Sequence, residues 1–491
     1  MKQNLIHFSL TDGIGLIVFA LAIAGIGLFT RTRKNNFVEY LAAGRSLTAP
    51  AMVMTLVSTW YGGVLGVGES ISYYGIGCWL LLGLPYYVFA IIYAYWLAGK
   101  VREGDDLSIP QRLFHQYGPS VGLIGASLIF LLGTPAANLY MLAVLVHLLT
   151  GITTSLCIFI SGVLGIVFLW RGGLLADVRL GIVAFIATYF GFIVIDLVCF
   201  AHQPLITAIH QLPGSNLKKI DGGQGIFAFM SFFILGAWTL VDPGFHQRVT
   251  SSAAPGIAKK GVLIATLCFM VSDFLTMSAG IYAIDRLQPL PKNHVAIFPI
   301  FANQILPNGL KAIFFIGLLG VTVSSHVGYT LVSGATMGRD IIAPAIKKVK
   351  QFDETQISKF GLIITTLVGG LIALWVHSVL AIWYTWTGIL IGALLIPVLA
   401  SYQRFPSRNL PQCALIAGML SSFITSLAWM IYGMSNNNPE LNVTYHGHSF
   451  SLGTMIPALT VSIIVTYSTA NIVWKLNRPM LETSTNKPSN Q

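Results

Sequence analysis

The sequence has very little charge for its length. Of its 491 residues, only 9% are Asp, Glu, Lys or Arg, whereas soluble domains carry roughly 25%. Hydrophobic residues make up 55% of the chain, and the mean hydropathy is +0.75. This composition excludes an ordinary soluble domain and predicts an integral protein of the plasma or inner membrane. The net charge of +11 does not indicate nucleic acid, because the basic residues fall in short loops between apolar runs.

Cysteine is also scarce, and none of the five cysteines forms a CxxC pair. All five lie in or beside apolar runs, so we expect small core residues and neither disulfides nor metal ligands. The sequence contains no paired carboxylates and no histidine cluster that would indicate an enzyme. It also has no charge rings or filter repeat of the kind found in channels. The expected surroundings are the lipid bilayer, and the sequence indicates no obligate protein partner.

Thirteen apolar runs are long enough to span a bilayer, which takes about 20 residues. An odd number of spans places the termini on opposite sides. With the amino terminus outside, 22 of the 28 Lys and Arg residues fall on the inner side, and this skew predicts a cytoplasmic carboxyl terminus. Residues 1–474 form a single predicted transmembrane domain, and residues 475–491 form a polar, disordered tail. The runs cover 11–30, 48–72, 75–98, 119–149, 152–170, 177–201, 225–247, 260–285, 310–335, 359–378, 380–402, 411–434 and 451–474.

The second run contains a predicted break in its helix. Residues 55–77 read TLVSTWYGGVLGVGESISYYGIG, and each glycine weakens a helix by about 1 kcal/mol relative to alanine. Glu69 lies in the same stretch, and a carboxylate at bilayer depth must face protein or water. Broken helices at this depth occur where they line a cavity. Close packing of helices through glycine is the alternative explanation.

The seventh run carries a second predicted break, at Asp242-Pro243-Gly244. Proline removes a backbone donor, and glycine lets the chain bend. Two breaks five spans apart indicate an inverted-repeat transporter with its site at the middle of the membrane. In the ninth run, Ser324 and Ser325 are adjacent hydroxyls near the carbonyl of Val321, and hard oxygen ligands suit a small cation such as Na⁺.

An acid beside aromatic residues suits an amine or an organic cation. We therefore predict that a small polar solute binds between the two breaks, at the residues listed at the end of this paragraph. Asp242 could instead be an acid at a helix end, and Glu69 could hold a helix end through backbone amides. Asp273, in the eighth run, is interpreted as a hydrogen bond between helices. The predicted solute-binding residues are Trp60, Tyr61, Glu69, Trp238 and Asp242.

The sequence resembles the sodium:solute symporter family over nearly the whole chain, in the order and spacing of several short motifs. The matching motifs are AAGRSL at 42–47, Gly-Gly-Leu at 172–174, Gln-Arg at 247–248, Ser-Ser at 324–325 and Arg-Asp at 339–340. The resemblance implies the leucine-transporter-type fold of five plus five inverted helices, with one extra helix before and two after. The repeats would cover about 48–201 and 225–402. Within the family, the stretch from Thr59 to Gly63 is most similar to the choline-transporter branch, where tryptophan stacks on a quaternary ammonium.

The resemblance also implies a sodium-coupled symporter that imports its solute by alternating access. Proton coupling through Glu69 and a nutrient sensor built on the same fold are the alternatives. Two departures from the family pattern remove ligands of additional sodium sites: Leu180-Gly181 replaces a Thr-Asp pair, and no acid follows Ser325. We therefore expect one Na⁺ per cycle. The implied sodium ligands are the carbonyls of Leu56, Thr59 and Val321 and the hydroxyls of Ser324 and Ser325.

Overall fold

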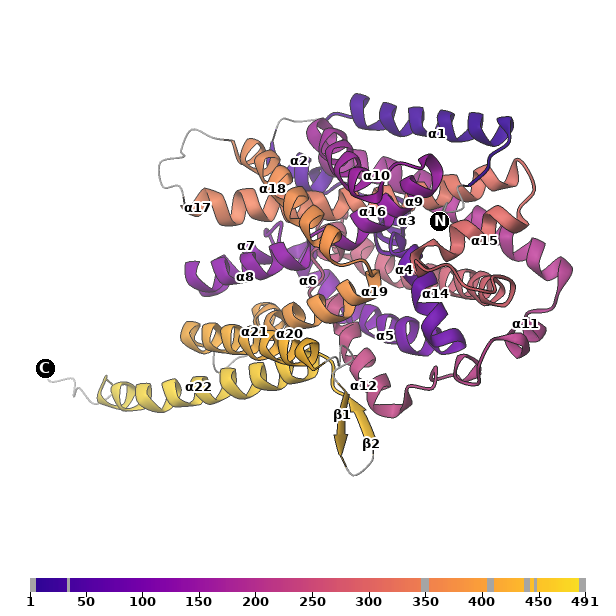
Figure 1. Ribbon diagram of the computed structural model, residues 1–491. Helices are drawn as coiled ribbons and strands as arrows, with labels where there is room; N and C mark the ends of the chain where they lie inside the picture. The colour runs from indigo at the N-terminus through magenta and orange to yellow at the C-terminus, as the bar shows by residue number, and fades with distance from the viewer. Residues whose placement is uncertain are drawn as a thin grey trace, which may run out of the picture.

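The computed structural model describes residues 6–32, 36–345, 353–403, 410–436, 442–445 and 448–484. The described chain is helical apart from one short antiparallel ribbon, formed by β1 (Asn442–Tyr445) and β2 (His448–Ser451). Figure 1 shows most of the long helices running in roughly the same direction across the molecule, with the ribbon projecting from one edge. The predicted all-α membrane fold is confirmed.

The first half of the chain ends with the longest helix, α10. Its helices, including short π-helical turns, are α1 (Leu10–Phe29), α2 (Phe37–Ala42), α3 (Ala49–Tyr61), α4 (Val64–Tyr74), η3 (Trp79–Gly83), α5 (Leu84–Ile92), η4 (Tyr93–Leu97), α6 (Ala98–Glu103), α7 (Ile109–Tyr117), α8 (Pro119–Leu132), α9 (Ala136–Thr150) and α10 (Thr154–His202).

The second half begins with short connecting helices outside the long spans. Its helices are α11 (Leu205–Gln211), α12 (Gly225–Leu235), η6 (Gly236–Leu240), α13 (Pro243–Thr250), α14 (Pro255–Arg286), α15 (Ile297–Ile305), α16 (Leu310–Ala335), η8 (Thr336–Ile342), α17 (Ala343–Ala345), α18 (Glu354–Trp375), α19 (Val379–Ala381), η9 (Ile382–Trp386), α20 (Thr387–Ser401), α21 (Gln412–Ser435) and α22 (Met455–Ser484).

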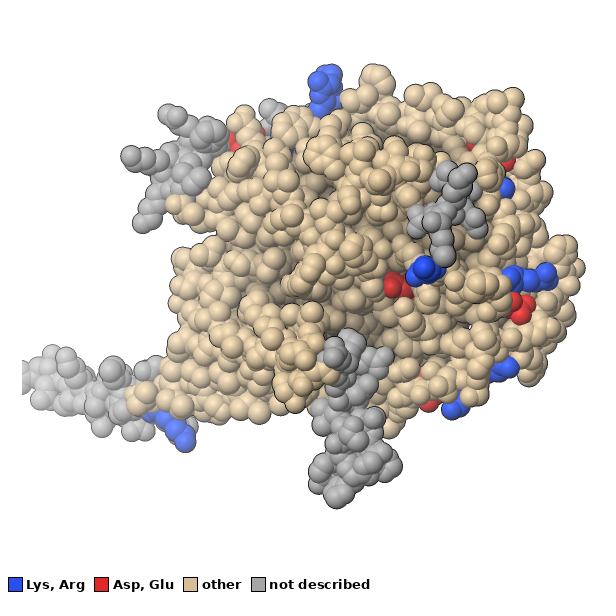
Figure 2. Space-filling model, viewed as in Figure 1, with Lys and Arg blue, Asp and Glu red and all other residues tan. Residues whose placement is uncertain are grey.

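Eleven helical segments of the described chain are long and apolar enough to cross a membrane, and the bent pair α3 and α4 adds a twelfth. Helix α10 has 49 residues, more than twice the roughly 20 residues that span a bilayer core. It is interrupted at Gly173, whose φ of 48° requires glycine. Dividing α10 there gives thirteen spans, in agreement with the predicted runs. Figure 2 shows that charged side chains cover little of the visible face.

Helices α10 and α16 pack against each other more extensively than any other pair in the described chain. Helix α1 packs on this pair at one edge of the molecule, while α20, α21 and α22 pack together at the opposite edge (Figure 1). Helix α22 continues to Ser484, so the beginning of the predicted tail is helical, and residues 485–491 lie outside the described residues. This arrangement places both predicted breaks in the interior, beside α16.

Candidate functional site

The first predicted break is present between α3 and α4. The two helices are bent by 50°, and Gly62 and Gly63 connect them. The amide of Gly63 bonds to the carbonyl of Trp60, so it does not take the carbonyl of Thr59 as a continuous α-helix would. The bend therefore leaves the Thr59 carbonyl oxygen available to a partner from another helix.

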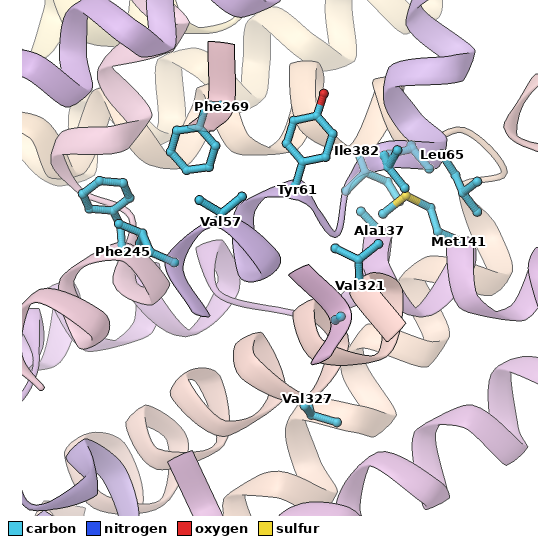
Figure 3. Close-up of a cluster of buried hydrophobic side chains, with 14 of the residues drawn as sticks. Val57, Tyr61, Leu65, Ala137, Met141, Phe245, Phe269, Val321, Val327 and Ile382 are labelled. Atoms are coloured by element: carbon cyan, nitrogen blue, oxygen red, sulfur yellow. The ribbon is translucent and has the colours of Figure 1, made fainter. Parts of the chain in front are cut away.

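That partner is Ser325 of α16. Its hydroxyl donates to the Thr59 carbonyl oxygen at 2.7 Å, and the amide oxygen of Asn138 lies 3.0 Å away as a second acceptor. Gly62 permits this approach, because a Cβ at that position would lie 1.9 Å from the Ser325 Cβ and 2.9 Å from the Val321 carbonyl oxygen. The first break and the serine pair, which lie in different apolar runs of the sequence, thus meet in the fold. In Figure 3 the side chain of Tyr61 points away from the bent segment on one side, and Val321 of α16 lies on the other side.

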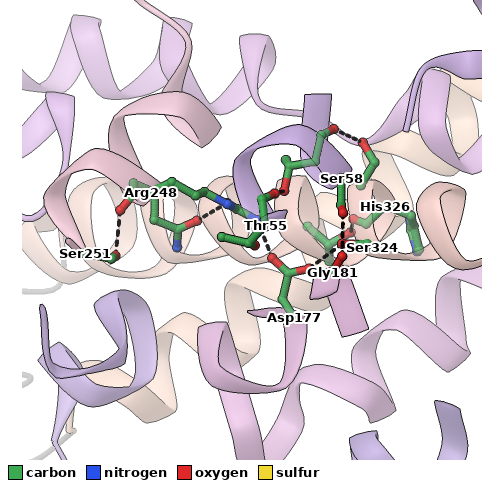
Figure 4. Close-up of polar contacts among 12 residues, drawn as sticks. Thr55, Ser58, Asp177, Gly181, Arg248, Ser251, Ser324 and His326 are labelled. Atoms are coloured by element: carbon green, nitrogen blue, oxygen red, sulfur yellow. Dashed lines mark hydrogen bonds and ion pairs between the residues drawn. The ribbon is translucent and has the colours of Figure 1, made fainter. Parts of the chain in front are cut away.

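Ser324 joins a buried ionic network on the other side of the serine pair. Its hydroxyl donates to Asp177 of α10 at 3.0 Å, and Asp177 also forms an ion pair with Arg248 of α13. Both charged side chains are fully buried, and Figure 4 shows the guanidinium reaching toward Asp177. Arg248 was counted above among the basic residues of the inner-side loops, but in the fold it belongs to α13, a helix whose side chains are all buried, and not to an exposed loop.

The second predicted break is also present. After η6 the chain is extended at Asp242, and α13 begins at Pro243. One carboxylate oxygen of Asp242 accepts from the amide of Phe245 at 2.5 Å, and the other accepts from the Tyr329 hydroxyl at 2.9 Å. Asp242 is thus a buried N-cap of the helix that carries Arg248. This geometry corresponds to the helix-end interpretation of the acid.

Glu69 likewise caps a helix. Its carboxylate accepts from the Ser378 hydroxyl at 2.7 Å and from the amides of Val379 and Leu380 at 3.0 and 3.1 Å. These amides are at the free amino end of α19, where a negative charge is stabilised. The contacts correspond to the alternative in which Glu69 holds a helix end.

A cavity of about 240 Å³ lies beside the first break. Trp60, Tyr61 and Trp238 line it, together with Thr59 and Ser325 from the serine contact. Neither Glu69 nor Asp242 is among the described residues that line it. The structure therefore brings three of the five predicted solute residues to one cavity and places two carboxylates outside it.

Two polar residues in the cavity wall were not assigned to a site by sequence reasoning. Asp273 of α14 accepts from the Tyr61 hydroxyl at 2.8 Å and from the Tyr87 hydroxyl, which confirms the predicted hydrogen bond between helices, and it also faces the cavity. Asn138 of α9 lines the cavity and contacts Ser325. An acid inside an apolar run was a usable signal for Asp273, but no sequence feature distinguished Asn138.

The chain is similar to known transporters in sequence and in fold. The profile of the Sodium:solute symporter family matches residues 40–400. A sodium/pantothenate symporter of Haemophilus influenzae is 25% identical over 393 residues, which cover 73% of this chain and 77% of that protein.

Among solved structures, the chain is similar to a substrate-bound, outward-open Na⁺-coupled sialic acid symporter. The TM-score is 0.78 at 14% identity, and the match covers 95% of this chain and 98% of that one. A manganese transporter of Eremococcus coleocola is a more distant match, with a TM-score of 0.53 at 12% identity over 92% of this chain and 98% of that one. At these identities the matches establish a shared leucine-transporter-type fold.

Proposed function

Because the chain belongs to the sodium:solute symporter family, we propose that Na⁺ binds where Ser325 meets Thr59. As a member of this family, the chain is a transporter that couples Na⁺ to the symport of a small solute. The ion would lie between the bend of α3 and helix α16. Its ligands would be the five oxygens implied by the resemblance: the carbonyls of Leu56, Thr59 and Val321 and the hydroxyls of Ser324 and Ser325.

The hydrogen bonds of the two serines support this site. A hydroxyl that coordinates a cation must direct its proton elsewhere and present a lone pair. Ser324 already donates to Asp177, and Ser325 can turn its proton from Thr59 to Asn138, 3.0 Å away. Both hydroxyls can thus serve as neutral oxygen ligands, the type that Na⁺ prefers over sulfur or imidazole.

We propose that the solute binds in the adjacent cavity, against Trp60, Tyr61 and Trp238. Thr59 and Ser325 line this cavity as well, so solute and ion would share a wall. Glu69 and Asp242 would act on the solute indirectly, by holding α19 and α13 in place. A shared wall gives each ligand a means to change the affinity for the other, which coupled transport requires.

The proposed cycle is alternating access between two inverted repeats, at about 48–201 and 225–402, with the amino terminus outside and the carboxyl terminus in the cytoplasm. Sodium would favour the outward-facing state, and solute would favour closure of the outer side, each through its differential affinity for the two states. An inward sodium step would gain about 2.3 kcal/mol per charge per 100 mV.

The single observation that carries the sodium site is the contact between Ser325 and Thr59, and thermal stability in NaCl tests it. The purified protein should melt at a higher temperature in NaCl than in KCl of equal ionic strength, because a bound ligand stabilises the folded state. Ser325→Ala should lose this difference. The matched control is Ser333→Ala, which removes another buried hydroxyl from α16 and should keep the difference. An unchanged NaCl response in Ser325→Ala would refute the site.

A further inference from the structure

We propose that the solute is a protonated amine and that Asp273 is the residue that recognises its ammonium group. The inference rests on the proposed function, because it takes the cavity beside the sodium site as the solute site. Among the described residues that line the cavity, Asp273 is the only one with a charged side chain. The chemistry of the cavity therefore depends on how this one carboxylate is surrounded.

Asp273 lies near the middle of the 32-residue span α14, at a depth where ionisable residues are rare and functional. Its hydrogen-bond partners are two phenols, Tyr61 from α3 and Tyr87 from α5. No Lys, Arg or His of the described chain forms an ion pair with it. Phenols orient the carboxylate, but they do not neutralise its charge.

A carboxylate has about four lone-pair positions, so two phenol donors leave two of them unused. A cation in the cavity could take these positions and compensate the charge. A solute anion would instead place a second negative charge beside Asp273. No described side chain of the cavity wall is cationic, and the single Na⁺ proposed beside the cavity would compensate only one of the two negative charges, so the other would be costly away from water. The cavity therefore favours a cationic solute over an anionic one.

The rest of the wall suits an apolar body attached to that cation. Eleven of the described lining residues are aromatic, and Trp60 packs edge to face on Tyr86 and at a tilt on Phe269. The Trp60 ring packs on Tyr86, Phe245 and Phe269, so three neighbouring rings hold it in the wall. A primary ammonium that donates N–H bonds to Asp273 fits these contacts better than a quaternary one, which has no N–H donor.

Four compounds of nearly equal shape test the charge and the donor separately. They are 3,3-dimethylbutylamine, choline, 3,3-dimethylbutan-1-ol and 3,3-dimethylbutanoate, with pantothenate as a fifth probe. Binding is measured with the purified full-length protein in NaCl by thermal shift and calorimetry. The amine should bind at least about tenfold more tightly than the alcohol and than choline, since a hydrogen bond to a charged group is stronger than one between neutral groups. Tighter binding of an anion or of choline would overturn the proposal.

Asp273→Asn should abolish the preference for the amine over the alcohol, whereas Asp273→Glu should retain part of it. The matched control is Asp285→Asn, which removes a carboxylate of the same helix that is not in the cavity wall and should leave the preference unchanged. Equal amine binding by Asp273→Asn and the parent protein would contradict the assigned role.

A second measurement does not depend on finding a ligand. Met277 lines the cavity one turn after Asp273, and Met277→Cys is treated with 2-aminoethyl or 2-sulfonatoethyl methanethiosulfonate. Mass spectrometry of the peptide containing position 277 gives the two rates, and the exposed Cys413 supplies the reference ratio in the same sample. The cationic reagent should be favoured several-fold relative to Cys413, and Asp273→Asn should remove this preference. Equal or inverted ratios in the presence of Asp273 would overturn the proposal.

The NaCl response separates the two hypotheses. Asp273→Asn should keep the stabilisation by NaCl, which also shows that the variant is folded. If the NaCl response follows Ser325 but the cavity shows no preference for cations, the sodium site stands and the substrate class falls. If the cavity prefers cations and Ser325→Ala keeps its NaCl response, the cationic substrate class stands and the sodium site falls.

Discussion

Ser325 of α16 and Thr59 of α3 meet at 2.7 Å, hydroxyl to carbonyl, although they are separated by 266 residues in the chain. The contact exists because α3 ends two residues later, at Tyr61, and the bend through Gly62 and Gly63 frees the Thr59 carbonyl. Movement of the bent helix relative to α16 would therefore change the proposed ion site directly, and this relationship leads to the predictions below.

Gly62→Ala should destabilise the protein and abolish its NaCl response. The added methyl would lie 1.9 Å from the Ser325 Cβ, so α3 and α16 would have to separate, at a cost of about 1–3 kcal/mol. Thermal unfolding in NaCl and KCl measures both effects. Gly13→Ala in α1 is the control, because its methyl would meet nothing within 4 Å, and it should be neutral or slightly stabilising. A normal NaCl response in Gly62→Ala would be inconsistent with the close approach.

The buried pair of Asp177 and Arg248 should give a strongly non-additive double-mutant cycle. Asp177→Asn or Arg248→Met alone leaves one uncompensated buried charge and should cost about 3–5 kcal/mol. The double variant should recover most of the lost stability in thermal unfolding. Additive losses would show that the two side chains act independently.

Asn138 should affect sodium affinity through the proton of Ser325. Asn138→Leu removes the second acceptor of that hydroxyl, so the serine would present its lone pair less readily, and the NaCl concentration for half-maximal stabilisation should rise about tenfold. Asn138→Asp keeps an acceptor oxygen and should retain sodium binding. If both variants bind Na⁺ like the parent protein, the amide has no such role.

Glu69→Gln should lower stability by about 1 kcal/mol while leaving the NaCl response intact. The carboxylate holds Ser378 and the first amides of α19, and the amide side chain retains only one acceptor oxygen for this capping role. Proton coupling through Glu69 predicts a different result, in which Glu69→Gln changes the pH dependence of solute uptake into proteoliposomes. Uptake measured with a fixed sodium gradient at several pH values distinguishes the two.

One Na⁺ per cycle predicts a Hill coefficient of about one for sodium activation of uptake. The family's Thr-Asp pair is replaced by Leu180-Gly181, and the nearby Asp177 is already paired with Arg248, so no free carboxylate of the described chain supplements the serine pair. Solute uptake into proteoliposomes at increasing sodium concentration measures the coefficient. A value clearly above one would require a further sodium site.

Much of the candidate site could be located from the sequence, but not the orientation of its acids. The glycines after Tyr61 and the proline after Asp242 mark both breaks, because these residues disrupt helices whatever surrounds them. Glu69, Asp242 and Asp273 are all acids in apolar runs, and the sequence analysis favoured the first two for the solute. In the fold these two cap helices, while Asp273 faces the cavity.

The sequence by itself determined that the chain is a thirteen-span membrane protein with two broken helices and a serine pair. Apolar length, glycine and proline act locally, so they can be read without knowing the neighbours. Only the tertiary structure decided that Ser325 reaches Thr59, that Arg248 pairs with Asp177 inside the protein, and that Asp273 is the acid of the cavity wall. Those contacts depend on the rotation and packing of helices distant in sequence, which periodicity does not specify.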